Sequence, residues 1–591
     1  MGSAAQSSTM AMAVRETAAN HGDLLAVRTA DDTISYTWAE LLEEIDLLAG
    51  GLSQLGVRRG STVALMMGNR PEFHIADLAV VTAGGAPFSI YQTYTAEQAA
   101  YVIADAGAEI AIVSSEFLEV VKEASKLAPS LKTIISVEGE TGEGLIPWSE
   151  VSGSNPGFDA ALAAESVQVD DLLTLIYTSG TTGPPKGVEL TNGNLLPVVR
   201  AVADLVHLEP GDRLISWLPA AHIAERDAHH YIPIVYGASI TCCPDPRHIV
   251  QFLPQVRPNW FFAVPRIWEK LKAGLEAMLE SQPAEQAAPI REALDDAIEA
   301  VRLKQAGSEI PEELAAKVAA ADESIFSNLR AMLGLDQVKT VGVGAAPTPV
   351  EVIEFFHAIG IELAELWGMS ETCGYGTLNT AGAVRIGTVG PPSPGAEIVL
   401  AADGEVLIRG ACVMKGYRNK PDATAEAIDS DGWLHTGDIG QFDDAGYLRI
   451  VDRKKEIIIN AAGKNMSPAN IEATVKSSSP LIGLACVIGD ARPYNTALLT
   501  LDPDVSAAWA AANEMEGFSI EELSQSEQLL GEITSAIDAA NAKMARVEQI
   551  KRFKVLPVDW PPGGDELTPT MKLKRKPIAE KYSTEIEDLY S

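Results

Sequence analysis

The sequence of 591 residues is long enough for more than one domain, and its 47% hydrophobic and 21% charged residues are ordinary for a globular protein. The formal net charge of −36 disfavours binding to nucleic acid or anionic lipid through the bulk surface, although the run "MKLKRK" (571–576) is a local basic patch. Five cysteines without disulfide or metal-site spacing fit a reducing cytoplasm.

The N-terminal segment 1–15 shows no targeting signal. Its sequence "MGSAAQSSTMAMAV" lacks the cationic start and apolar core of a signal peptide, and Gln6 stands where a myristoylation pattern needs Ser or Thr. No apolar run approaches the roughly 18–20 residues that span a membrane. We therefore expect a flexible N-terminus and a cytoplasmic protein. The sequence leaves open whether the protein contacts a membrane peripherally or forms a homodimer.

From about residue 25 to 250, short apolar runs alternate with helical patterns. The runs "TVALMMGN", "GAPFSIY", "AEIAIVSS" and "LKTIISVEG" predict buried strands. The stretches "TWAELLEEIDLLAGGLSQLG" and "TAEQAAYVIADAG" predict amphipathic helices that end at glycine. This alternation favours a largely parallel α/β architecture.

Residues 177–191, "YTSGTTGPPKGVELT", form a glycine-rich loop directly after an apolar run. Glycines let backbone amides converge on an anion, hydroxyl side chains add donors, and Lys186 adds a positive charge, so the loop predicts phosphate binding. It does not match the nucleotide-binding P-loop, because Pro185 replaces the second glycine and Gly187 follows the lysine. A flexible surface linker is the alternative.

The second half of the chain divides into three regions. Apolar residues recur at helical spacing in 267–333, which predicts a mainly helical insertion packed against the core. Further on, "AEIVLAADGEVLIRG" predicts a β-hairpin that turns at Asp403 and Gly404. The charged, strand-like stretch around 452–455 is typical of an interdomain hinge, and we expect a smaller α+β domain over 456–591.

Four further segments give the loop a specific meaning. They are "LWGMSETCG" (366–374), "WLHTGDIG" (433–440), "YLRIVDRKKEIIINAAGKNMSP" (447–468) and "LTPTMKLKR" (567–575). In this order, they closely resemble the acyl-adenylate-forming, AMP-binding superfamily, over about residues 15 to 585. The resemblance implies an α/β fold with a large N-terminal AMP-binding domain of several subdomains (16–451), a hinge (452–455) and a small, mobile C-terminal α+β domain (456–591).

Two other segments, "LPAAHIAERD" (218–227) and "PNWFFAVPRIWEKL" (258–271), resemble the long-chain fatty acyl-CoA synthetase branch. The implied reaction has two steps. A fatty acid carboxylate attacks the α-phosphate of ATP, which gives acyl-AMP and pyrophosphate, and the thiol of coenzyme A then displaces AMP. The implied cofactors and co-substrates are ATP, Mg²⁺ and coenzyme A.

The resemblance also assigns the nucleotide site. The glycine loop would hold the β- and γ-phosphates, Glu371 and Thr182 would bind Mg²⁺, and Trp367 would stack on adenine where relatives usually have tyrosine. Asp438 would accept bonds from both ribose hydroxyls, supported by Arg453. The full set implied for ATP is Thr178, Ser179, Gly180, Thr181, Thr182, Gly183, Lys186, Gly344, Ala345, Ala346, Trp367, Gly368, Ser370, Asp438 and Arg453.

The remaining assignments concern catalysis and the second step. Lys572 would reach the α-phosphate and the substrate carboxylate and offset the charge that builds there. His222 resembles the residue beside the acyl carboxylate, and Lys455 occupies the hinge position. Gly463 and Lys464 would contact coenzyme A.

Each assignment has a structural alternative. Glu371 could be an exposed loop carboxylate, Trp367 a core aromatic and His222 a structural histidine. Asp438 and Arg453 could form only a salt bridge. Lys572 lies in a basic tail in which two other lysines compete for its role, Lys574 and Lys576.

The function has alternatives too. A fatty acyl-AMP ligase would pass the adenylate to a carrier protein, and a synthetase could prefer medium-chain or aromatic acids. An oxygen-dependent luciferase and a non-catalytic binding protein could share the fold. The joint presence of Lys186, Glu371, Asp438, Arg453 and Lys572 argues against a non-catalytic protein.

Overall fold

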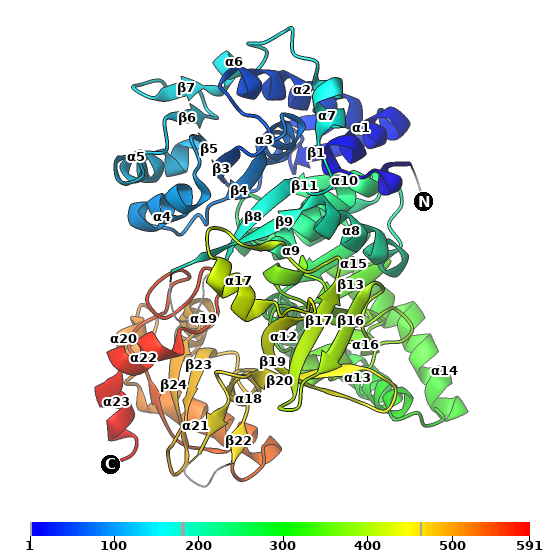
Figure 1. The fold of residues 1–591 in the computed structure, drawn as a ribbon. Helices are drawn as coiled ribbons and strands as arrows, with labels where there is room; N and C mark the ends of the chain where they lie inside the picture. The colour runs from blue at the N-terminus through cyan, green and yellow to red at the C-terminus, as the bar shows by residue number, and fades with distance from the viewer. Residues whose placement is uncertain (1–2, 179–183, 461–463) are drawn as a thin grey trace.

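The computed structural model describes residues 3–178, 184–460 and 464–591. Figure 1 shows a large N-terminal part, coloured blue to yellow, and a smaller C-terminal part in orange and red below it. All five cysteines are free and buried. No helix within the described ranges combines the length and the apolar composition that crossing a bilayer would need.

The first sheet is five-stranded and entirely parallel, as the sequence predicts for this region. Its strands, in spatial order, are β4 (Ala86–Ser89), β3 (Thr62–Met66), β5 (Ile110–Val113), β6 (Thr133–Ser136) and β7 (Leu145–Pro147). The central strands are buried along their whole length, which explains their continuous apolar runs. The accompanying helices are α2 (Trp38–Gln54), α3 (Pro71–Thr82), α4 (Ala96–Ala106), α5 (Leu118–Leu127), α6 (Trp148–Val151) and α7 (Ala160–Ser166).

Local signals in the sequence fix where these helices begin and end. Capping boxes start α2 at Thr37 and α4 at Thr95, so backbone amides in the first turn are satisfied by side chains. Gly107 ends α4 with φ +73°, a left-handed conformation that glycine adopts without strain.

Two further sheets share the large domain core. One contains β10 (Arg213–Ser216), β11 (Ser239–Cys242), β1 (Leu25–Thr29) and β2 (Ser35–Thr37), and the other is the antiparallel set β18 (Gly416–Tyr417), β9 (Lys186–Thr191) and β8 (Leu172–Thr178). The glycine-rich loop joins β8 to β9, and β9 begins directly after Pro184 and Pro185. Helices of this region are α8 (Asn192–Val206), α9 (Ile223–Arg226), α10 (Ile232–Tyr236) and α11 (Ile249–Val256).

The predicted helical insertion separates two strands of the next sheet. That sheet contains β12 (Trp260–Ala263), β13 (Thr340–Val343), β14 (Leu363–Trp367) and β15 (Thr377–Leu378). Between β12 and β13 lie α12 (Pro265–Glu280), α13 (Ala284–Gln305), α14 (Glu312–Ala321) and α15 (Ser327–Leu333), and α16 (Val350–Ala358) follows β13. The buried Trp268 packs edge-on against Phe261 and Phe356, which anchors the insertion to the core.

An antiparallel sheet then leads to the C-terminal domain. Its strands are β16 (Ala396–Leu400), β17 (Glu405–Gly410), β19 (Leu434–Phe442) and β20 (Leu448–Arg453), with α17 (Pro421–Ala427) before β19. The predicted hairpin is present, because β16 and β17 pair around Asp403 and Gly404, and Gly404 has φ +86°.

The C-terminal domain has an apolar core of its own. Its strands are β21 (Ile458–Ile459), β22 (Asn465–Met466), β23 (Ile482–Ile488), β24 (Asn495–Leu501) and β25 (Ile550–Val555). Its helices are α18 (Pro468–Ser477), α19 (Pro503–Ala512), α20 (Ile520–Leu523), α21 (Glu527–Lys543), α22 (Arg575–Lys581) and α23 (Ser583–Asp588).

The N-terminal segment differs from the expected flexible one. Helix α1 begins at Met10 and runs to His21, with Met10 and Val14 fully buried. The Met10 amide donates to Asn192 Oδ1 over 2.9 Å, and the Arg200 guanidinium donates to the carbonyl of Ala5 over 2.5 Å. The apolar residues of this segment therefore pack onto the large domain.

Arg226, in the segment "AERD" (224–227), forms a buried ion pair with Asp77 of α3. The side chains of Arg226 and Asp77 are both inaccessible to solvent, with 2.6 Å between Arg226 Nη1 and Asp77 Oδ2. His230 Nε2 lies 3.0 Å from the other oxygen of Asp77. Burial acts to raise the pKa of Asp77, but Arg226 and His230 outweigh it and hold that pKa below its usual value.

We expect Asp77→Asn to destabilise the protein by about 3–5 kcal/mol, because it leaves the Arg226 charge buried without a counterion. Since the pKa of Asp77 is lowered, its stabilising contribution is complete at neutral pH and is lost only as pH falls through that pKa. Urea unfolding followed by tryptophan fluorescence measures the change. The control is Glu119→Gln, which breaks an exposed pair with Lys122 and should cost less than about 1 kcal/mol. Equal losses in the two variants would contradict the prediction.

Candidate active site

The ribose end of the predicted nucleotide site is built around the Asp438 carboxylate. Asp438 lies on β19, and its partner across the sheet is Arg453, the last residue of β20. The Trp367 indole donates to Asp438 Oδ2 over 2.8 Å, and Arg453 Nε lies 2.8 Å from Oδ1. A carboxylate offers about four lone-pair positions, so Asp438 can keep both partners and still accept bonds from two hydroxyls.

Trp367 lies differently from the adenine-stacking aromatic that the resemblance implies. Only 8% of its surface is exposed, and it packs with Val406 and Leu448 in a small apolar cluster. A Cβ at Gly376 would lie 2.7 Å from Trp367 Cε3, so the backbone there covers the ring closely. This burial favours the core aromatic over the stacking platform. The contribution of Trp367 to the site is its hydrogen bond to Asp438.

Residues 344–346 directly follow β13. Because β13 and β14 are parallel neighbours, these residues lie at the edge of the sheet where β14 also ends. Gly344 is buried, and a Cβ there would lie 2.9 Å from the Leu366 side chain. Ala345 and Ala346 are exposed, and Ala345 has φ +71°, a left-handed conformation that is costly for a residue other than glycine. Because Ala345 and Ala346 are exposed, they could still line an adenine pocket, as predicted.

Glu371 is buried in a short 3-10 helix (Ser370–Thr372) directly after β14. The structure thus excludes an exposed loop carboxylate. The hydroxyl of Tyr417 donates to Glu371 Oε1 over 2.8 Å, and Lys186 Nζ stands 4.7 Å from the centre of the Tyr417 ring. Just before Ser370, a Cβ at Gly368 would lie 2.2 Å from the carbonyl oxygen of Gly374, so only glycine fits there.

Sequence reasoning missed Tyr417. Its ring lies between the lysine that follows the glycine loop and the predicted metal ligand, because β18 pairs with β9. The only signal in the sequence is an aromatic residue beside glycine and arginine in "MKGYRN" (414–419). Nothing in that pattern indicates which distant strand it joins.

The chemistry of Glu371 fits a Mg²⁺ ligand. Among the described residues, no group of three or more His, Cys, Asp or Glu side chains is arranged to hold a metal ion. Mg²⁺ is commonly bound by one or two carboxylates together with substrate phosphates, so the single buried carboxylate of Glu371 would be sufficient if the predicted loop holds phosphates.

Lys572 is the residue of the C-terminal domain whose charge interacts with this site. Its pKa is lowered, first by burial and then by the charge of Arg453, while the carboxylates of Asp438 and Glu371 oppose the shift. Arg453, Asp438, Glu371 and Glu456 are therefore near enough to act on the charge of Lys572, which is exposed to solvent. The structure therefore brings the predicted lysine and the predicted nucleotide-binding carboxylates together.

His222 is also close to Lys572. Burial, and then the Lys572 charge, lower the pKa of His222 to about 4, so the imidazole is neutral at physiological pH. His222 caps α9, and its Nδ1 accepts the amide of Ala224 over 3.1 Å. Because Nδ1 is the acceptor, Nε2 carries the proton and can donate to a carboxylate.

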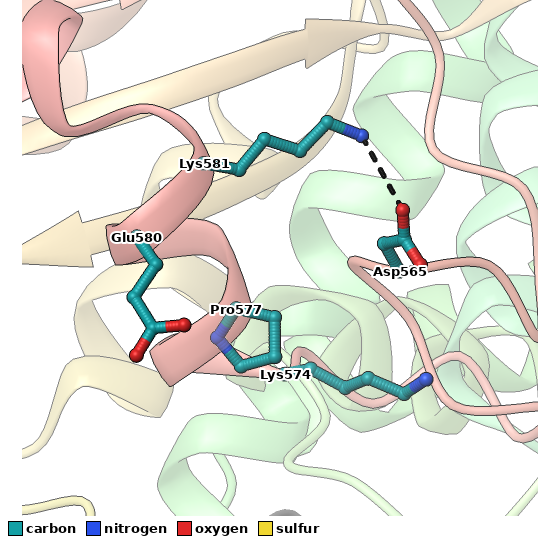
Figure 2. A pocket seen from close by; sticks show the side chains of 5 residues that line it. All are labelled: Asp565, Lys574, Pro577, Glu580 and Lys581. Atoms are coloured by element: carbon teal, nitrogen blue, oxygen red, sulfur yellow. Dashed lines mark ion pairs between the residues drawn. The ribbon is translucent and has the colours of Figure 1, made fainter.

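The two competing lysines have other partners. Lys574 Nζ donates to the carbonyl of Gly564 over 2.8 Å, and Lys576 Nζ lies 3.9 Å from Glu580 in an exposed pair. Figure 2 shows Lys574 beside Pro577, lining a pocket of the C-terminal domain together with Asp565, Glu580 and Lys581. Lys572 is thus the lysine of this tail that reaches the large domain site.

The predicted loop and coenzyme A residues are only partly described. Thr178 ends β8 and Lys186 begins β9. The backbone amide of Lys464 donates to Asn460 Oδ1 over 3.0 Å between β21 and β22. The other predicted residues in these two loops lie outside the described ranges, namely Ser179, Gly180, Thr181, Thr182, Gly183 and Gly463.

The predicted hinge, 452–455, contains residues that are hydrogen-bonded to opposite domains. The Lys454 amide donates to the carbonyl of Gly437 on β19 over 2.8 Å, which holds Lys454 to the large domain. Asp452 Oδ2 accepts from Ser467 Oγ over 2.5 Å, and Ser467 caps helix α18 of the small domain. Lys455 follows directly and is exposed.

Ion pairs across the two domains stabilise this arrangement. Arg266 at the start of α12 pairs with Asp502, which caps α19, and Lys543 Nζ lies 3.2 Å from Glu351. In Figure 1, β22 lies at the end of the small domain away from β8 and β9. Lys464 directly precedes β22, so this end of the small domain lies away from the two strands that flank the glycine-rich segment.

Comparison with known proteins agrees with this geometry. The AMP-binding enzyme family matches residues 14–418, and the AMP-binding enzyme C-terminal domain matches residues 455–591. The chain belongs to the AMP-binding enzyme family. It is 48% identical to "Putative fatty-acid--CoA ligase fadD11" of Mycobacterium tuberculosis H37Rv, over 74% of this chain and 77% of that protein.

Two other comparisons cover nearly the whole chain. The long-chain-fatty-acid–CoA ligase FadD15 of M. tuberculosis H37Rv is 35% identical over 94% of this chain and 92% of its own. A crystal structure of the anthranilate CoA ligase AuaEII with anthranoyl-AMP superposes with a TM-score of 0.72 at 19% identity, covering 97% of both chains. The latter likeness shows the adenylate-forming fold.

We expect Lys572→Ala to reduce adenylate formation at least about a hundredfold and to spare the thioester step, because its ammonium stands where charge builds during attack on the α-phosphate. Acid-dependent exchange of pyrophosphate into ATP measures the first step, and synthetic acyl-AMP supplied with coenzyme A isolates the second. Lys574→Ala is the matched control and should retain both steps, since Lys574 bonds within its own domain. Equal losses in both steps for Lys572→Ala would show that the role is wrongly assigned.

We expect Lys455→Pro to leave adenylation intact and to lower thioester formation at least about tenfold, because proline fixes φ where the small domain must rotate. The Lys455 amide donates no hydrogen bond to a described residue, so proline should not disturb the present arrangement. Lys455→Ala removes the same side chain, keeps φ free and should behave like the unaltered protein. Normal rates of both half-reactions in Lys455→Pro would place the pivot elsewhere.

Proposed function

We propose that this protein activates long-chain fatty acids with ATP and transfers them to coenzyme A, releasing AMP and pyrophosphate. The observation that carries the proposal is the position of Lys572, which comes from the C-terminal domain and lies among Asp438, Glu371 and His222 of the large domain. A fatty acid–CoA ligase needs a positive charge close to both the bound nucleotide and the substrate carboxylate. Two relatives support the proposal, since one is named a putative fatty-acid–CoA ligase and the other a long-chain-fatty-acid–CoA ligase.

In the first step, the substrate carboxylate is held between the Nε2–H of neutral His222 and the ammonium of Lys572. The carboxylate attacks the α-phosphorus of ATP, the P–O bond to pyrophosphate breaks, and Lys572 offsets the added negative charge. Asp438 positions the ribose. Mg²⁺ held by Glu371 and the phosphates would neutralise charge on the leaving pyrophosphate.

In the second step, the coenzyme A thiol attacks the acyl carbon and AMP leaves. Lys572 is not required there, so the small domain can rotate about Lys455 and bring the segment of Gly463 and Lys464 to the acyl-AMP. Interactions between the domains hold the present arrangement and have to break for this rotation. They include the hydrogen bond from Ser467 to Asp452, the ion pair of Arg266 with Asp502 and the ion pair of Lys543 with Glu351.

A fatty acyl-AMP ligase is the nearest alternative, and a coenzyme A thioester assay separates it from the proposed activity. Peripheral membrane contact and a homodimer stay predictions from the sequence. Flotation with lipid vesicles tests the first and light scattering the second.

We expect the preferred acid to carry roughly 12 to 18 carbons. Each buried methylene contributes about 0.8 kcal/mol, and ordering the chain offsets part of this gain. From this contribution per methylene, the value of kcat/KM should fall at least about a hundredfold from palmitate to octanoate. Acetate and benzoate should be poor substrates. A higher kcat/KM for acetate or benzoate than for palmitate would overturn the long-chain assignment.

A further inference from the structure

Strand β18 holds Tyr417 beside the end of the glycine-rich loop. Its pairing with β9 places Tyr417 opposite Val188, two residues after Lys186. The amide of Arg418 donates to the carbonyl of Gly187 over 2.7 Å and continues this pairing. The backbone of Tyr417 is therefore fixed relative to the lysine that ends the loop.

The same segment contacts Glu371 at both its backbone and its carboxylate. The Met414 amide donates to the Glu371 carbonyl over 2.8 Å, and the Tyr417 hydroxyl donates to Glu371 Oε1 over 2.8 Å. No other hydrogen bond to this carboxylate is formed within the described residues, so Oε2 is left for a ligand. A flexible glutamate side chain loses rotamer freedom when it binds a ligand, and a partner that fixes it beforehand removes this cost.

The ring of Tyr417 makes a separate contact. Lys186 Nζ stands 4.7 Å from the ring centre, within the roughly 6 Å over which an aromatic face attracts an ammonium group. Within the described ranges, no carboxylate forms an ion pair with Lys186. An aromatic face holds a positive charge in place without neutralising it, so the full charge stays available to a phosphate group.

One side chain thus contacts two groups of opposite charge, with its hydroxyl on the carboxylate and its ring face on the ammonium. We propose that Tyr417 is a positioning residue for the adenylation step. Its hydroxyl presets the Glu371 carboxylate so that Oε2 faces the metal position, and its ring keeps Lys186 towards the nucleotide phosphates. This proposal rests on the proposed function and adds a residue to its first step.

Binding without turnover gives the first test. Isothermal titration calorimetry with ATP and no acid, in Mg²⁺ and in EDTA, gives the factor by which Mg²⁺ strengthens ATP binding. Removing a group that hydrogen-bonds a ligating side chain typically weakens metal binding by about 10- to 100-fold. Tyr417→Phe keeps the ring and loses the hydroxyl, so it should lower that factor about tenfold and leave the affinity for metal-free ATP unchanged.

Tyr417→Leu removes both contacts. It should lower the same factor and also weaken the binding of metal-free ATP about two- to fivefold, the effect of one cation–π contact. In the pyrophosphate exchange assay, Tyr417→Phe should raise the Mg²⁺ concentration for half-maximal rate about tenfold. Thioester formation from synthetic acyl-AMP and coenzyme A should not change, because no pyrophosphate leaves in that step.

Two further variants separate positioning from a structural role. In a Glu371→Gln background, Tyr417→Phe should change the Mg²⁺ factor less than about twofold, because the hydroxyl acts through that carboxylate. Tyr582→Phe is the matched control, since the Tyr582 hydroxyl donates to Glu566 over 3.0 Å in the C-terminal domain, and its loss should leave the Mg²⁺ factor unchanged. Thermal unfolding verifies that each variant is folded, and Tyr417→Phe alone decides the role of the hydroxyl.

If Tyr417→Phe keeps the Mg²⁺ factor, or weakens the binding of metal-free and Mg²⁺-bound ATP equally, Tyr417 does not position Glu371. The proposed function stands in that case, provided that palmitate still gives a coenzyme A thioester. If the unaltered protein forms no thioester with any acid, the proposed function fails. A lowered Mg²⁺ factor in Tyr417→Phe would then still support the assignment of Tyr417 to the nucleotide site.

Discussion

The two-sided engagement of Asp438 is the interaction on which the site depends. One oxygen is held by Trp367 and the other by Arg453, so a single carboxylate joins the end of β14, the middle of β19 and the last residue of β20, which lies in the predicted hinge. Because Asp438 is 5% exposed, losing either partner would leave part of a charge poorly satisfied in a nearly dry environment. The nucleotide site and the domain junction are therefore parts of one structure.

A link between the nucleotide site and the domain junction suits an enzyme that catalyses two reactions in one active site. The proposed function requires a junction that is rigid enough to place Lys572 near His222 and Glu371, and that releases this lysine after the first step. Asp452 and Lys454 show how this is arranged, since neighbouring residues bond to different domains with Lys455 next to them. A few bonds of ordinary strength hold the arrangement, and breaking them requires no change in either apolar core.

The sequence predicted most of the fold that depends on local pattern. The buried parallel strands, the hairpin at Gly404 and the helical insertion all follow from apolar periodicity and turn residues. The role of Lys572 stays a prediction from motif order. Tyr417 was not predicted as a site residue, because its position depends on the pairing of β18 with β9, which are more than two hundred residues apart in the chain. Motif position predicts that Trp367 stacks on adenine, but it cannot reveal that only 8% of the surface of this residue is exposed, which favours a core aromatic. The packing of Met10 was missed because a short apolar segment next to a terminus does not reveal its partner, Asn192.

The interdomain ion pairs have a consequence for the conditions under which the protein works. Lys543 and Glu351 are both well exposed, as are Lys270 and Asp504, which face each other at 3.8 Å. Attraction between such groups is weakened by dissolved salt, whose screening length is about 8 Å at physiological ionic strength. The packed interior of each domain is insensitive to salt by comparison. In the proposed mechanism, the balance between the present arrangement and a rotated one would therefore depend on the ionic composition of the solution. The partition between adenylation and thioester formation would then be a property of the medium as well as of the chain.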